Sequence, residues 1–298
     1  MPMPPDFGRF SEVSTEFDAA SKALWLRMHS RPVQCYSPAL LGQLGEITTR
    51  VLAQPAGQVG HLVLASSTPG VFNFGGDLAL FSLLSRARDK AALVGYGKQC
   101  LDRVFFLVEA PLHGLVTVAL VAGDALGGGL ESALAAQLVI AEKGAQMGFP
   151  EVLFNLFPGM GGWQLAGRRA GRKVAAELIS SGSVYNAEQL FDMGLVDILA
   201  EPGQGEAEVQ KYLSRQSSRS QGLAAAYAAE LDALPLDRAQ FDRVVERWAE
   251  AALQIGDRDR RLMRHLARSQ LKKSCGFSQA GAVEAIRREV GQEAALAA

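Results

Sequence analysis

The sequence predicts an α/β fold, in which short strands alternate with helices and a run of helices ends the chain. Three apolar segments, residues 24–28, 61–65 and 116–121, have the length and composition of buried strands. Two glycine-rich turns lead into helix-forming stretches at residues 78–87 and 130–137. Repeated units of strand, turn and helix are typical of α/β architecture.

The composition changes after about residue 214, where the stretch SRQSSRSQG is polar and predicts a linker or a loose helix junction. Beyond it almost every residue belongs to a helix-forming stretch, the longest being 238–255 and 258–273. We therefore expect two parts, an α/β core over residues 1–214 and a C-terminal helical module over residues 215–298.

The overall composition narrows the class of protein. The 298 residues are 48% hydrophobic and 20% charged, with a formal net charge of −1, so no global charge attracts nucleic acid or a membrane. Cys35, Cys100 and Cys275 are odd in number and lack metal-ligand spacing, which argues against a disulfide framework or a zinc site. With neither a secretory signal nor a membrane-length apolar run in view, we expect a cytoplasmic protein.

The segment ALGGGLESALAA, residues 125–136, sets three glycines and a glutamate at the start of a helix. Gly127, Gly128 and Gly129 allow a sharp turn and let a ligand approach bare N–H groups. The first N–H groups of a helix have no internal partner and suit an oxyanion. Glu131 falls in the first turn, where its carboxylate reaches the same ligand; the alternative is a tight turn with a glutamate favoured by the helix dipole.

A second glycine turn lies in VFNFGGDLALF, residues 71–81. Asp77 is suited to cap the helix that follows. The backbone N–H of Phe74, next to Gly75, is the expected second oxyanion donor. Two donors from separate loops make a better oxyanion hole than one, and each stabilises the transition state by about 3 kcal/mol.

The third segment, MGFPEVLFNLFPGMGG, carries Glu151 directly after Pro150. Proline makes the residue before it extended, which helps to aim Glu151 into a cleft. Phe149, Leu153 and their apolar neighbours would disfavour the charged carboxylate and raise its pKa toward the range of a general acid. The alternative is an ordinary surface glutamate on a turn.

In this order the three segments, with the later stretch YNAEQLFDMGLVDILAEPG, resemble the crotonase (enoyl-CoA hydratase/isomerase) superfamily over about residues 61–202. Within it they are most similar to diffusible signal factor synthases. The resemblance implies a spiral of ββα turns, a trimer or dimer of trimers, and no metal or other cofactor. It implies catalytic roles for Glu131 and Glu151 and an oxyanion hole made by the N–H groups of Phe74 and Gly128. The substrate-binding residues that it implies are Gly75, Gly127, Gly129, Leu153, Met160, Trp163 and Trp248.

Two residues depart from the superfamily pattern. Phe74 is bulkier than the usual small residue, and Trp163 replaces a small polar residue. Both are expected to reshape the acyl site, which favours the signal-synthase branch over generic β-oxidation.

With both carboxyl groups present, the resemblance implies dehydration of a medium- or long-chain 3-hydroxyacyl thioester carried on acyl carrier protein or CoA. One glutamate takes the C2 proton and the other protonates the departing hydroxyl, with the acid and base unassigned. The signal-synthase resemblance adds thioester hydrolysis, which releases a cis-2-unsaturated fatty acid. The alternatives are an ordinary enoyl-CoA hydratase without thioesterase activity and a non-catalytic regulatory partner with the same fold.

Residues 257–273 hold seven Arg or Lys and only two Asp. The stretch is either a solvated helix face or a docking patch for an acidic carrier protein or CoA phosphates. The basic residues are Arg258, Arg260, Arg261, Arg264, Arg268, Lys272 and Lys273.

Overall fold

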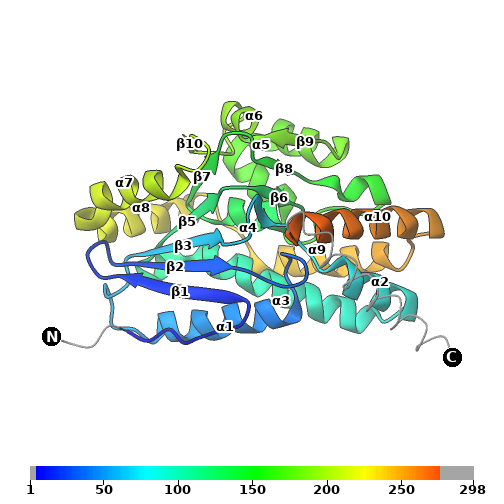
Figure 1. The fold of residues 1–298 in the computed structure, drawn as a ribbon, viewed down its shortest axis with the longest axis horizontal. Helices are drawn as coiled ribbons and strands as arrows, with labels where there is room; N and C mark the ends of the chain where they lie inside the picture. Colours follow the sequence, from blue (N-terminus) through cyan, green and yellow to red (C-terminus); the bar gives the residue numbers. More distant parts are fainter. Residues whose placement is uncertain (1–4, 276–298) are drawn as a thin grey trace.

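Two β-sheets, linked strand by strand along the chain, form the centre of the structure (Figure 1). The computed structural model describes residues 5–275. The larger sheet has the order β1-β2-β3-β5-β7-β10, and only its β1–β2 pair is antiparallel. Its strands are β1 (Val13–Asp18), β2 (Ala23–Met28), β3 (His61–Ser66), β5 (Val116–Val121), β7 (Leu138–Glu142) and β10 (Ile198–Ala200).

The smaller sheet has the order β4-β6-β8-β9, with β9 antiparallel to β8. Its strands are β4 (Val71–Asn73), β6 (Asp124–Leu126), β8 (Gln146–Gly148) and β9 (Val184–Asn186). The pairs β3/β4, β5/β6 and β7/β8 each give their first strand to the larger sheet and their second to the smaller one. The chain therefore winds as repeated ββα turns, which confirms the predicted fold.

Helices follow each turn of this spiral, and their first residues lie at the ends of the short strands. They are α2 (Leu78–Ala87), α3 (Lys90–Glu109), α4 (Gly128–Ala135), the 3₁₀ helix η2 (Pro150–Phe154) and α5 (Gly162–Ser181). The elements outside these turns are α1 (Pro38–Leu52), η1 (Ala110–His113), α6 (Ala187–Asp192) and α7 (Gly205–Gln216).

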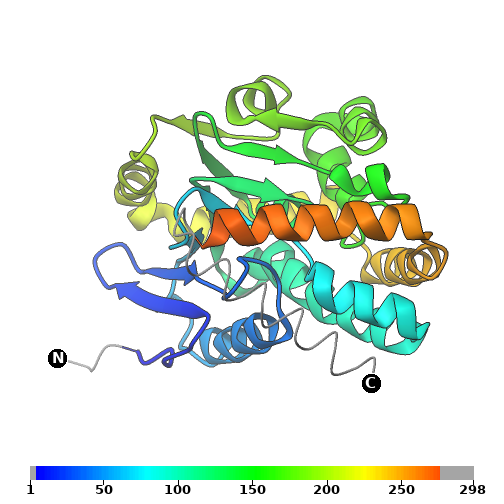
Figure 2. The ribbon, with the colours of Figure 1, turned by 45° about the vertical axis from the view of Figure 1, so that its right-hand side comes forward.

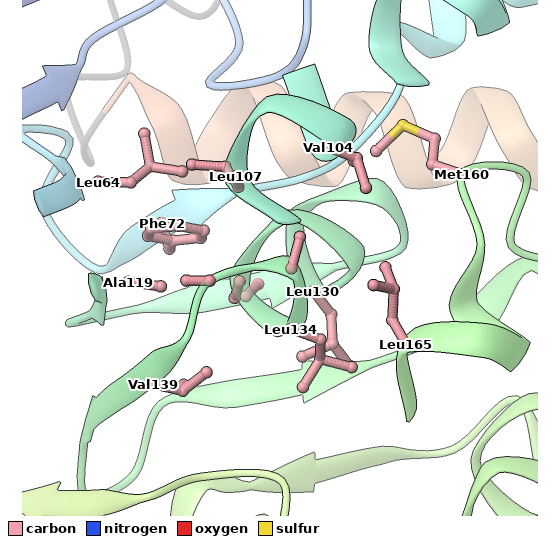
Figure 3. Packing of buried hydrophobic residues seen from close by; sticks show 14 of the residues in the cluster. Leu64, Phe72, Val104, Leu107, Ala119, Leu130, Leu134, Val139, Met160 and Leu165 are labelled. Atoms are coloured by element: carbon pink, nitrogen blue, oxygen red, sulfur yellow. The ribbon is translucent and has the colours of Figure 1, made fainter. Parts of the chain in front are cut away.

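The main core lies between the larger sheet and the spiral helices. Leu130 and Leu134 of α4 belong to the same buried cluster as Phe72 and Ala119 (Figure 3). Every residue of β5 is buried, as its uninterrupted apolar sequence predicts for a central parallel strand. This packing fixes the position of α4, and with it the glycine turn at its start.

Three helices, α8 (Ser220–Ala233), α9 (Arg238–Ala252) and α10 (Asp257–Ser274), end the described chain. Helix α9 packs on α3, and α10 crosses the front of the molecule against α2 and η2 (Figure 2). The polar stretch near residue 214 is a helix junction, in which α7 passes through η3 (Ser217–Arg219) into α8. The boundary at residue 214 stays a prediction, and residues 276–298 of the expected module lie outside the described range.

The expected elements agree with the observed ones closely. Residues 116–121 and 78–87 match β5 and α2 at both ends, whereas α4 starts at Gly128, ahead of the expected residue 130. Within residues 5–275, no helix has both the length and the hydropathy that crossing a bilayer requires.

Candidate active site

Glu131 lies in the first turn of α4 and is almost completely buried, with 1% of its surface exposed. Gly127 is the N-cap of this helix, and its φ of +54° is strained for any residue with a side chain. The Glu131 Oε1 atom accepts hydrogen bonds from the backbone N–H groups of Met160, at 2.8 Å, and Gly162, at 2.7 Å. The glycine-rich turn before α5 therefore holds one oxygen of this carboxyl in place, which leaves Oε2 to carry a proton.

Glu151 lies in η2, where Pro150 occupies the first position. A Cβ atom placed on Gly127 would come within 2.5 Å of Glu151 Oε1, so the missing side chain makes room for this carboxyl group. Its Oε2 atom is buried and has no hydrogen-bond partner among the described residues. The two glutamates thus flank one glycine turn, one from inside the helix and one from across it.

Both carboxyl groups hold their protons far above the usual pH range of glutamate. Burial, and next the nearby charge of Glu151, raise the pKa of Glu131 to about 8 against the opposing N–H groups of Gly162 and Met160. Burial raises the pKa of Glu151 to about 7. Each group can therefore give or take a proton near neutral pH.

The two glycine turns touch each other. Gly75 has a φ of +85°, and a Cβ there would lie 2.6 Å from the Gly128 nitrogen. A Cβ on Gly129 would lie 2.0 Å from the carbonyl oxygen of Asn73. Gly75 and Gly129 consequently shape the site by close backbone contact, and neither lines the cavity described below.

The amide expected from Phe74 is not presented to the site. Its N–H donates to the carbonyl oxygen of Gln34 at 2.9 Å. In the same turn the N–H groups of Gly75 and Asp77 donate to side-chain oxygens. The Gly76 N–H has no acceptor among the described residues, and Gly76 lines the cavity. The expectation for Phe74 is therefore corrected, and the unengaged amide of this turn is that of Gly76.

A cavity of about 260 Å³ joins these groups. Its wall is mostly apolar and includes four of the predicted substrate-binding residues, Gly127, Leu153, Met160 and Trp248. Phe74 also lines it, together with residues that sequence reasoning missed, among them Tyr96 and Cys100 of α3 and Leu266 and Gln270 of α10.

Trp163 does not line this cavity, which corrects its predicted contact with substrate. It is the second residue of α5 and 43% exposed, whereas Leu165 in the same helix is buried. The helix rotates Trp163 away from the site.

Helix α10 separates the cavity from a basic surface. Leu266 and Gln270 lie on its cavity side. Its exposed residues include Arg258, Arg261, Arg268 and Lys272. Arg260 pairs with Asp257 at 3.4 Å, and Lys273 pairs with Asp124.

Over residues 5–275 we find no group of three or more His, Cys, Asp or Glu side chains placed to hold a metal ion. The groups that this arrangement offers for chemistry are two carboxyl groups and backbone amides around an apolar cavity.

The ββα spiral with helices over a glycine-lined cavity defines the crotonase class of protein. The chain belongs to the enoyl-CoA hydratase/isomerase family, since the model of that family matches residues 38–234. The superfamily resemblance drawn from the sequence is confirmed.

Relatives identified by sequence agree with this assignment. The chain is 32% identical to "Probable enoyl-CoA hydratase" of Bacillus subtilis over 62% of its length, and 34% identical to "Crotonyl-CoA hydratase" of Syntrophomonas wolfei over 60%. The matched parts span about two thirds of these relatives, 67% and 65% of their lengths.

Among solved structures, the fold is similar to that of enoyl-CoA hydratase from Bacillus halodurans, with a TM-score of 0.74 at 20% identity, covering 86% of this chain and 100% of that one. For the enzyme from Bacillus anthracis the TM-score is 0.69 at 21% identity, with 89% and 98% covered.

Proposed function

We propose that the protein is a hydratase-type lyase that dehydrates 3-hydroxyacyl thioesters and also hydrolyses the thioester. The observation that carries the proposal is the pair of buried carboxyl groups, Glu131 and Glu151, in one apolar cavity beside the unengaged Gly76 amide. The names of the relatives from Bacillus subtilis and Syntrophomonas wolfei, both hydratases, support the dehydration step and its reverse.

In this proposal Glu131 is the acid of the dehydration and Glu151 is the base. Glu131 has Oε1 occupied by two N–H donors and the higher pKa, about 8, so it carries a proton on Oε2 at neutral pH. Glu151 has an unpartnered Oε2 and a pKa of about 7, so much of it is charged at neutral pH and free to accept a proton.

The N–H groups of Gly76 and Gly128 polarise the thioester carbonyl, Gly128 because it heads α4. Glu151 takes the C2 proton, and the C–H electron pair enters the enolate. The enolate re-forms the carbonyl and expels the C3 hydroxyl, which leaves as water with the proton of Glu131. The products are a 2-enoyl thioester and water.

The hydrolysis step uses the same amides. Water attacks the thioester carbonyl, Glu151 takes its proton, and the tetrahedral oxyanion binds Gly76 and Gly128. The C–S bond then breaks, and the thiolate leaves with a proton from a carboxyl group. The apolar cavity and the motifs shared with diffusible signal factor synthases support a free cis-2-unsaturated acid as the final product.

Mass spectrometry of the products from a 3-hydroxydecanoyl thioester tests both steps. We expect loss of water followed by release of the free unsaturated acid. A 2-enoyl thioester without free acid would reduce the function to that of an ordinary hydratase. If no product forms, the protein is instead a non-catalytic binding partner with the crotonase fold.

We further propose that the acyl group arrives on an acidic carrier protein that docks on α10. The exposed Arg261 and Arg268 lie on the helix whose other side lines the cavity. Replacing both by Glu should raise the KM for carrier-bound substrate at least tenfold and leave the KM for a pantetheine thioester unchanged. The matched control reverses Arg215 and Arg219, which are exposed near the α7–α8 junction. Equal KM values for carrier substrate in all variants would contradict docking at α10.

A trimer or dimer of trimers is also proposed, from the superfamily resemblance. Sedimentation velocity measures it directly, and a monomer would contradict it.

A further inference from the structure

Tyr36 connects the two glycine turns, although it belongs to neither and does not line the cavity. It lies between β2 and α1, with 2% of its surface exposed. Burial raises the pKa of Tyr36 well above its usual range, so its hydroxyl remains a hydrogen-bond donor at every working pH.

The backbone of Tyr36 holds the turn that contains Gly76 from both sides. The Tyr36 N–H donates to the carbonyl oxygen of Gly75 at 2.8 Å. The Tyr36 carbonyl oxygen accepts from the Tyr96 hydroxyl at 2.8 Å, and this hydroxyl in turn accepts from the Asp77 N–H at 2.8 Å. Gly76 is thus placed between two anchored neighbours with its own N–H left unengaged.

The side chain of Tyr36 reaches the other turn. Its hydroxyl donates to Ser132 Oγ at 2.5 Å, and Ser132 Oγ donates to the carbonyl oxygen of Gly129 at 2.9 Å. All three residues are buried, so the two hydrogen bonds are shielded from competing water. They end in the first turn of α4, which also presents Gly128 and Glu131.

We propose that Tyr36 is a positioning residue that sets the distance between the Gly76 and Gly128 amides, an inference that rests on the proposed function. Two donors stabilise an oxyanion only when both point at the same oxygen atom. The direct contacts here, Gly75 with Gly128 and Gly129 with the Asn73 backbone, are made by glycines that have no side chains to interlock. The hydrogen bonds from Tyr36 to Ser132 and from Ser132 to Gly129 add a polar connection between the two turns. A misplacement of about 1 Å in such a site costs up to 100-fold in rate.

The test is Tyr36→Phe, which removes one hydroxyl and keeps the ring. We expect kcat to fall about tenfold, with KM within a factor of two of the wild-type value, because the amides act on the transition state. Ser132→Ala breaks the same connection from α4 and should give the same loss. The double variant should lose no more than either single one. The matched control is Tyr212→Phe on α7, because Tyr212 is half-buried against a separate apolar cluster that includes Trp25 and Val63, and it does not line the cavity.

A spectroscopic measurement separates positioning from general loss of structure. The infrared C=O stretch of trans-2-decenoyl-CoA, labelled with ¹³C at the thioester carbonyl, should shift down on binding to the wild-type protein. The shift should be smaller in Tyr36→Phe and Ser132→Ala and unchanged in Tyr212→Phe. Ser132→Ala carries the test alone if Tyr36→Phe fails to fold.

Wild-type kcat and carbonyl shift in both variants would overturn the positioning role, and so would losses that multiply in the double variant. If the wild-type protein is active, either of these outcomes contradicts only the role of Tyr36 and not the proposed function. A wild-type protein that neither turns over nor polarises the thioester would overturn the proposed function, and the role of Tyr36 with it.

Discussion

The surroundings of Glu131 and of Glu151 differ in a way that separates their proposed roles. Glu131 is enclosed by α4 and the turn before α5, and two N–H groups hold one of its oxygens. Glu151 lies in a short 3₁₀ turn whose next residues, Val152 and Leu153, are 37% and 53% exposed. The carboxyl group of Glu131 is fixed, whereas Glu151 has one oxygen without a hydrogen-bond partner in the described part of the chain. A fixed carboxyl suits donation along one direction, and a less constrained one suits proton removal from a substrate.

The largest expected effect is on turnover. Glu131→Gln keeps an oxygen for the N–H groups of Met160 and Gly162 but carries no transferable proton. Glu151→Gln removes the base. Each should lower kcat for dehydration about 10³-fold, because each ends one proton transfer. Steady-state kinetics of water loss measure it. A variant with near wild-type kcat would show that its glutamate is not part of the pair.

Substitutions of Glu131 and of Glu151 should also differ in their effect on the stability of the protein. Glu131→Met leaves two buried N–H groups without an acceptor and should lower the free energy of unfolding by about 2–3 kcal/mol at pH 5. Glu151→Met removes an oxygen that has no hydrogen-bond partner within residues 5–275, and it should change the free energy of unfolding by less than about 1 kcal/mol. Urea denaturation at fixed pH gives both values. Equal losses in the two variants would contradict the difference between the sites.

The stability of Glu151→Met relative to wild type should rise with pH. The pKa of Glu151 is raised from 4.5 to about 7 by burial, so the wild-type protein is favoured at low pH and loses stability as pH rises from about 4.5 through 7. Methionine does not titrate. Between pH 5 and pH 8 the variant should gain roughly 2 kcal/mol on wild type, and no gain would show that the carboxyl is not desolvated.

A smaller effect is expected in the pH profile of kcat/KM. The base must be charged, so activity rises with pH through about 7, where Glu151 titrates. The acid must be protonated, so activity falls above about 8, where Glu131 titrates. Outside this window the rate should drop about tenfold per pH unit. Initial rates between pH 5 and pH 10 test it, and a profile that stays flat from pH 6 to pH 9 would contradict both assignments.

The parts of the site that local sequence determines were predictable. Gly127 to Gly129 at the start of a helix place Glu131 in its first turn, and the apolar run at β5 defines a central strand. The amide of Phe74 was not predictable, because its acceptor, Gln34, lies 40 residues earlier and reaches it only in the folded chain. Tyr36 was missed for the same reason, since its partners come from α3, from α4 and from the turn that contains Gly75.

The position of Trp163 could not be predicted from the sequence either, since the rotation of α5 about its axis depends on packing that the motif alone does not reveal.

The smallest expected effect compares Trp163 with a residue of the cavity wall. Leu153→Ala, beside Glu151, removes part of the cavity wall and should raise the KM for a decanoyl substrate about threefold to fivefold, since half of that side chain is already in water. Trp163→Ala removes a larger side chain outside the cavity and should leave KM and kcat within a factor of two. Michaelis–Menten kinetics on both variants show whether the acyl chain contacts the cavity wall at Leu153 or the surface of α5 at Trp163. A larger rise in KM for Trp163→Ala than for Leu153→Ala would mean that the acyl chain extends over α5, and that the rim beside Glu151 is not where substrate enters.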